Sequence, residues 1–204
     1  SRGDGKLSSL GGGFTARYTN KADVYTEAGI HAGRMKNDAE RVMIDELGNA
    51  YSYETHSNYW GINLGVGKKF RLSNTRDYDI YGTFYYNRRG GSSFTAGGAH
   101  YDLDAVNSEL LRVGARYNHR LNEEAKLYAG LALDYEFGGK SGGTVGTGIV
   151  SECIRSSDTK GATGMLELGV ELKAPESPWE LNLGAKAYAG ERKGFSGNLG
   201  IKYL

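Results

Sequence analysis

The stretch AKLYAGLALDYEF, residues 125–137, alternates between apolar side chains and side chains that are polar or very small. Side chains at alternate positions of a strand point to opposite faces of a sheet. One face would carry Leu127, Ala129, Leu131, Leu133, Tyr135 and Phe137. Such a strand suits a soluble sheet whose apolar face covers a core, and it equally suits a membrane barrel whose apolar face meets lipid.

Eight other windows show the same period of two, although aromatic residues fall on both rows of 79–89. No window has the periodicity of an amphipathic helix, apart from a weak helical turn at AVNSELL, residues 105–111. The sequence therefore predicts about nine strands, at 12–19, 23–35, 59–70, 79–89, 110–121, 125–137, 165–173, 179–190 and 195–203.

The predicted strands are joined by connections of two sizes. Short segments rich in turn residues occur at 73–77, 121–124 and 174–178. Long polar segments follow Met35, Arg89 and Phe137, and we expect them to form loops, including a mobile glycine-rich loop at 138–148. Short turns on the periplasmic rim and long loops on the outer rim are typical of an outer-membrane meander.

The composition narrows the class of protein. The 204 residues include 32 glycines, 15 tyrosines and only 2 prolines, which is typical of many strands joined by turns. Lys and Arg total 25 against 24 Asp and Glu, so no basic surface for nucleic acid is predicted. The single cysteine, Cys153, excludes an intrachain disulfide and a cysteine-based metal site. Because no secretory signal or initial Met is present, we expect a piece of a longer polypeptide.

Three features favour lipid over a protein core as the partner of the apolar rows. Aromatic residues lie near strand ends, as in the girdles at the two bilayer interfaces. The long connections lie on one side of the predicted sheet. The polar rows combine both signs of charge with glycine, which would leave room for contents in a wet lumen. We predict that the lumen is lined by Arg17, Glu27, Arg112, Arg116, Asp134, Glu167 and Lys186.

Candidate catalytic and ligand-binding motifs are weak. The histidines, at 31, 56, 100 and 119, lack metal-ligand spacing and lack an evident Ser or Asp partner. The segment 138–148 lacks the spacing of a phosphate-binding loop. The RGD tripeptide at 2–4 is short enough to occur by chance. We therefore expect no enzymatic activity, no cofactor and no metal.

The amino-acid sequence of several predicted strands resembles that of the autotransporter β-domain, the translocator of type V secretion. The similar segments are DVYTEAGIHAGRMKND (23–38), LLRVGARYNHRL (110–121), KLYAGLALDYEFGG (126–139), ATGMLELGVEL (162–172) and LNLGAKAYAGERKGFSGNLGIKYL (181–204). The resemblance implies an all-β, antiparallel, up-and-down transmembrane barrel of twelve strands in the bacterial outer membrane. It also implies a helix in the lumen and a secreted passenger N-terminal to that helix.

The sequence departs from the family pattern in two ways. Nine strands would correspond to the C-terminal part of the barrel, roughly strands four to twelve, with 1–11 as a linker or truncated edge and 12–204 as a partial barrel domain. Family members commonly end in Phe, whereas here Tyr203 is followed by Leu204, which puts the assembly signal in question.

The function implied by the resemblance is that of a translocator that anchors and helps to export its passenger. The implied partners are membrane lipid, the chain's own passenger and lumenal helix, and the outer-membrane barrel assembly machinery. In some relatives lumenal carboxylates help to cleave the passenger, but we expect Glu27 and Asp134 to be salt-bridge partners. The alternatives are a passive outer-membrane pore, an adhesin-like barrel, and a soluble β-rich binding module.

Overall fold

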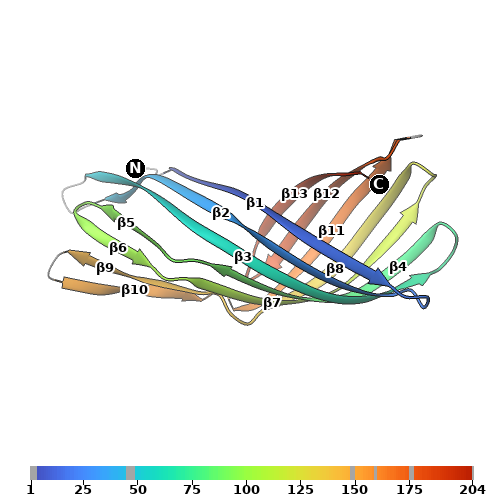
Figure 1. Cartoon of the computed structure of the whole chain (residues 1–204), viewed down its shortest axis with the longest axis horizontal. Helices are drawn as coiled ribbons and strands as arrows, with labels where there is room; N and C mark the ends of the chain where they lie inside the picture. The colour runs from blue at the N-terminus through green and yellow to red at the C-terminus, as the bar shows by residue number, and fades with distance from the viewer. Residues whose placement is uncertain (1–3, 45–48, 148–149, 159, 175–176, 204) are drawn as a thin grey trace.

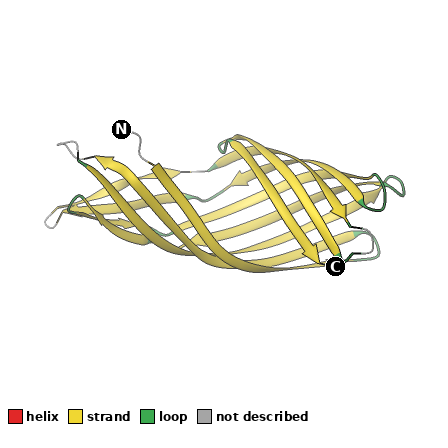
Figure 2. Cartoon of the chain, turned by 90° about the horizontal axis from the view of Figure 1, so that it is seen from above, coloured by secondary structure: helices red, strands yellow, loops and turns green. Residues whose placement is uncertain are grey.

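The chain forms one large curved antiparallel sheet and one small sheet (Figures 1 and 2). The computed structural model describes residues 4–44, 49–147, 150–158, 160–174 and 177–203. The large sheet contains, in spatial order, β1 (Asp4–Thr19), β2 (Val24–Ile44), β3 (Ala50–Arg71), β4 (Arg76–Arg89), β7 (Val106–Arg120), β8 (Ala125–Glu136), β11 (Gly161–Lys173), β12 (Trp179–Gly190) and β13 (Gly194–Tyr203). The nine predicted strands of the meander are confirmed.

The apolar rows of these strands point away from the concave side of the sheet. In β8, the side chains of Leu131 and Leu133 are 67% and 56% exposed, whereas Asp134 in the same strand is 1% exposed. The same contrast recurs in β11, where Leu168 is 52% and Glu167 is 2% exposed. The apolar faces are thus open to the surroundings, and the polar faces are turned inward.

Aromatic pairs lie at both ends of the apolar band on the outward face. Near the short turns, Phe70 stacks on Tyr78 with ring centroids 4.8 Å apart, and Trp179 meets Tyr203 edge-on at 5.1 Å. Toward the other end, the ring of Trp60 lies 5.4 Å from that of Tyr86. Two aromatic belts that flank an apolar band match the two interfaces of a bilayer.

The long connections contain more regular structure than the sequence predicted. Residues 36–58 were expected to form a loop, but β2 continues to Ile44 and β3 begins at Ala50. A membrane-crossing strand needs only about 9–11 residues, whereas β2 and β3 have 21 and 22. Polar cross-strand partners such as Lys36 and Glu54 support this extension, and their polarity is what made it resemble a loop.

A second sheet replaces the other two expected loops. Its strands, in spatial order, are β10 (Val150–Asp158), β9 (Lys140–Thr147), β6 (Ala99–Leu103) and β5 (Ser92–Ala96). The expectation of a mobile glycine-rich loop at 138–148 is therefore wrong, because β9 fills most of it. The weak helical turn at 105–111 is also wrong, since β7 begins at Val106.

The small sheet lies at the end of the molecule that carries the long β2–β3 extension (Figure 1). It packs on the inner face of β3, where the ring of Tyr53 stacks on Phe94 at 4.1 Å and Phe94 stacks on Tyr101 at 4.8 Å. Phe94 is 9% exposed, so these rings form a small core of their own. The concave side of the extension is thus covered by protein.

The large sheet is open along the edges formed by β1 and β13 (Figure 2). Among the described residues, β1 pairs with β2 alone and β13 with β12 alone. Every strand in the sheet is antiparallel to its neighbour, so the first and the ninth run in the same direction. Direct closure would require a parallel pair, whereas antiparallel closure requires an odd number of further strands between the edges. No helix within the described ranges is long and apolar enough to cross a membrane.

Candidate functional site

A polar hollow occupies the concave face of the large sheet. Its volume is about 230 Å³, and its lining side chains come from seven strands that are far apart in sequence. They are Arg17, Tyr25, Glu27, Gly65, Asp79, Tyr81, Thr83, Tyr85, Arg112, Arg116, Glu167 and Lys186. Alternation within each strand places these residues on the inner face, and the antiparallel register brings them to one level of the sheet.

Six of the seven predicted site residues line this hollow, and the seventh lies beside it. Asp134 accepts two hydrogen bonds from the Arg112 guanidinium, at 2.7 Å from Nε and 2.9 Å from Nη2. Arg112 and Asp134 are directly paired neighbours on β7 and β8. The predicted residues are thus brought together by the fold, although the sequence did not show which would pair.

Asp134 is the most deeply buried of these charged side chains. Besides the bonds from Arg112, its second oxygen accepts a hydrogen bond of 2.6 Å from Arg192. Arg192 lies between β12 and β13 and reaches Asp134 across β11. Arg192 was not predicted from the sequence, because it lies outside the alternating strand pattern and no local signal marks it.

Glu167 is held between two cations. Its carboxylate oxygens lie 2.5 Å from the Arg116 guanidinium and 3.2 Å from the Lys186 ammonium. Lys186 is the direct cross-strand partner of Glu167, and Gly130 lies between Glu167 and Arg116 in the register. The glycine leaves the space through which the arginine reaches the carboxylate.

Two further contacts lie nearer to β1. Glu27 accepts hydrogen bonds from Arg17 at 2.7 and 3.0 Å in a pair that is partly exposed. The Tyr25 hydroxyl donates a hydrogen bond of 2.8 Å to Asp79, which is 54 residues away in the chain. Sequence reasoning missed Tyr25 and Asp79, because such a contact depends on the spatial order β2, β3, β4.

From the sequence, we expected the glycines of the inner rows to make room for contents in the lumen, and in the structure two of them make room for tyrosine side chains. Tyrosine rings from neighbouring strands lie over them. A Cβ atom on Gly67 would meet the ring of Tyr25, and one on Gly169 would meet the ring of Tyr128 as well as a backbone carbonyl. These glycines therefore allow tyrosines to lie flat against the sheet, which narrows the interior with rigid, half-polar rings.

The hollow holds charged groups of both signs in close balance. Its lining includes four cationic and three acidic side chains, and most of them pair with one another. Among the described residues, no group of three or more His, Cys, Asp and Glu side chains could hold a metal ion. Paired charges of opposite sign leave little net charge on this surface.

Known proteins share this architecture. A family model described as the autotransporter β-domain matches residues 1–186. The solved β domain of the Bordetella autotransporter BrkA aligns with a TM-score of 0.74 at 21% identity, over 98% of this chain and 74% of that one. The translocator domain of NalP from Neisseria meningitidis aligns with a TM-score of 0.71 at 14% identity, over 99% of this chain and 67% of that one. A comparison with curated proteins found no match.

The structure and the family match agree on the class of protein. The apolar rows and the aromatic belts face outward, the inner face is polar, and the family model covers most of the chain. The chain belongs to the autotransporter β-domain family and is an outer-membrane translocator barrel domain of the type V secretion class.

Proposed function

We propose that this domain anchors an attached passenger in the outer membrane and lets it cross as an extended or helical polypeptide along the concave face. The observation that carries the proposal is the balanced polar hollow on the inner face, set behind apolar rows that face outward. A polypeptide in hydrocarbon would leave backbone groups without partners, whereas a wet channel hydrates them.

Transport requires a closed channel, so we propose that further strands complete the sheet. Lipid tails cannot form hydrogen bonds with the unpaired backbone groups along the free edges of β1 and β13. Barrels in membranes are closed for this reason. The parallel direction of the two edge strands favours an odd number of added strands. A twelve-stranded barrel would need three, and both similar structures extend beyond the part that this chain matches.

Within this barrel, the seven predicted residues are proposed to line the pore and to hold a lumenal helix. Arg17 and Glu27 suit this role best, since their side chains are 54% and 23% exposed and can exchange partners. The Asp134 and Glu167 carboxylates, 1% and 3% exposed, are proposed to hold the wall of the pore in shape instead. Membrane lipid and the outer-membrane barrel assembly machinery are the further proposed partners.

Export is tested with the intact gene product in bacterial cells, with a protease-sensitive reporter placed in the passenger. We expect added protease to cleave the reporter on unbroken cells, because the passenger reaches the surface. A variant that lacks β12 and β13 should keep the reporter inside, since its sheet cannot close. A reporter that stays inside while the barrel is inserted and small solutes leak through it would contradict export and favour the passive pore.

The orientation of the sheet is tested with the single cysteine. Cys153 is exposed on β10, in the small sheet at the end opposite the short turns. We expect a membrane-impermeant maleimide to label Cys153 on intact cells. With Cys153→Ser in the background, Ser73→Cys in the turn between β3 and β4 should react only after the outer membrane is permeabilised. The reverse pattern of labelling would contradict the proposed orientation.

A further inference from the structure

A shallow hollow lies on the outward face of β1–β3, on the side of the apolar band away from the short turns. Its volume is about 390 Å³. It is lined by Ser8, Ser9, Leu10, Arg34, Lys36 and His56. The register places Leu10 opposite Arg34 and Ser8 opposite Lys36, with Lys36 opposite His56. The hollow thus combines hydroxyl and cationic groups directly beside an apolar side chain.

The hollow lies where the apolar band ends. Leu10 is 84% exposed and Trp60 is 44% exposed. Trp60 lies on β3 two positions from Asn58, which is the cross-strand partner of Arg34. The next outward-facing position of β2 beyond the belt is Arg34, and no described residue forms an ion pair with it. An unpaired arginine at this level would face the headgroups of the outer leaflet.

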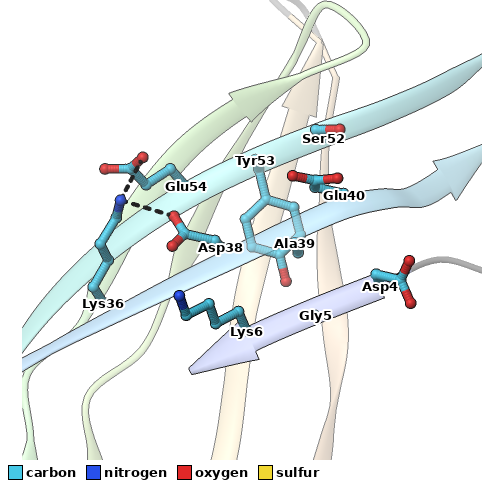
Figure 3. A pocket seen from close by; sticks show the side chains of 10 residues that line it. All are labelled: Asp4, Gly5, Lys6, Lys36, Asp38, Ala39, Glu40, Ser52, Tyr53 and Glu54. Atoms are coloured by element: carbon cyan, nitrogen blue, oxygen red, sulfur yellow. Dashed lines mark ion pairs between the residues drawn. The ribbon is translucent and has the colours of Figure 1, made fainter. Parts of the chain in front are cut away.

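A second hollow, of about 560 Å³, lies further along the same strands (Figure 3). Figure 3 shows the Lys36 ammonium between the carboxylates of Asp38 and Glu54, at 3.1 and 3.0 Å. Hydrogen bonds to Glu54 and then to Asp38 raise the pKa of Lys36 above its ordinary value. Asp4 and Glu40 add further negative charge there and Lys6 adds one cation, so the lining carries four acidic and two cationic side chains. The surface therefore changes from apolar to cationic and then to acidic with distance from the apolar band.

We propose that the hollow lined by Ser8, Leu10, Arg34 and Lys36 binds the phosphate group of a phosphorylated glycolipid in the outer leaflet. Arginine and lysine donate charge-assisted hydrogen bonds to phosphate oxygens, and serine hydroxyls add neutral ones. The acyl chains would lie along Leu10 and Trp60. The carboxylates of Asp38 and Glu54 repel a phosphate placed further out, so the depth of the phosphate is set from both sides.

Charge complementarity and position favour a lipid over a soluble anion. A free phosphate gains nothing from the exposed Leu10, whereas a lipid buries it together with its own acyl chain. The ring of His56, whose Nε2 lies 3.6 Å from Glu54, adds a further N–H donor at the edge of the hollow. This inference rests on the proposed orientation, in which the end that carries the small sheet lies outside the cell, but it does not depend on passenger export.

The test uses the purified intact protein in nanodiscs that contain either bisphosphorylated lipid A or the same lipid with its phosphates removed. Bound lipid is counted by native mass spectrometry. We expect the phosphorylated lipid to be retained and the dephosphorylated lipid to be retained about tenfold less, which corresponds to one charge-assisted contact. The double variant Arg34→Gln, Lys36→Gln should lose the preference.

The matched control is Lys68→Gln, which removes a cation from the outward face of β3 at the opposite end of the apolar band. This variant should keep the preference for the phosphorylated lipid. Equal retention of the two lipids by the unmodified protein would overturn the proposal without any variant. A double variant that retains its preference, or a Lys68→Gln variant that loses it, would overturn it too.

Discussion

Replacing Asp134 by alanine is expected to lower the free energy of unfolding of the domain by about 3–5 kcal/mol, the range found when one partner of a buried ion pair is removed. Asp134 is 1% exposed and accepts hydrogen bonds from both Arg112 and Arg192. Its loss leaves the Arg112 guanidinium, which is 17% exposed, without its carboxylate. It also detaches the connection between β12 and β13 from β8.

The measurement is a urea titration of the folded protein in detergent micelles, followed by the mobility of unheated samples in gels. Glu27→Ala is the matched control, because it removes the same kind of charge from an arginine pair that is partly exposed. Its effect should stay below about 1 kcal/mol. If the two variants lose the same stability, the buried network around Asp134 does not hold the barrel wall together.

Replacing Gly169 by alanine is expected to destabilise the sheet by about 1–3 kcal/mol, the typical cost of overpacking. The added methyl group would meet the ring of Tyr128 from one side and the backbone carbonyl of Leu183 from the other. The Tyr128 ring can rotate away, but it would then lose its contact with position 169. The backbone of β12 at Leu183 can move only if the pairing of β11 with β12 loosens.

The control for this variant is Gly82→Ala on β4. A Cβ atom at Gly82 would come no closer than 3.9 Å to another described atom outside its own neighbours, and it would point outward with the apolar row. We expect this variant to be neutral or more stable by up to about 1 kcal/mol, because glycine weakens strands. Destabilisation of both variants by the same amount would show that the contact between Gly169 and the Tyr128 ring does not decide the outcome.

The sequence predicted the meander because alternation is a local property. Leu131, Asp134 and Glu167 occupy the faces that their positions indicated, and Arg112 meets Asp134 because neighbouring strands align them. The family resemblance added the outer-membrane location. Contacts across an intervening strand, such as Arg192 with Asp134, could not be predicted, since they depend on side-chain reach as well as on strand order.

The small sheet shows a different kind of failure. Its segments are rich in glycine and serine, and this composition favoured a loop over a strand. A usable signal was nevertheless present in the sequence, because the glycine pair Gly97–Gly98 lies between FTA and AHY. In the structure these two glycines have positive φ angles of 59° and 78°. Two such residues form the tight turn of a hairpin. Tyr53 and Phe94 then hold that hairpin against β3, which no local pattern could indicate.

We expect the passenger to cross along the polar inner face while the outer face meets lipid. Adjacent residues on β4 test it, because Tyr85 lines the inner hollow and Phe84 lies on the outward row. A photo-crosslinking phenylalanine analogue is placed at one or the other position while a bulky reporter arrests the passenger in transit. We predict that the analogue at position 85 crosslinks to the passenger and that the analogue at 84 does not. Crosslinking of the passenger from position 84 and not from 85 would contradict the account.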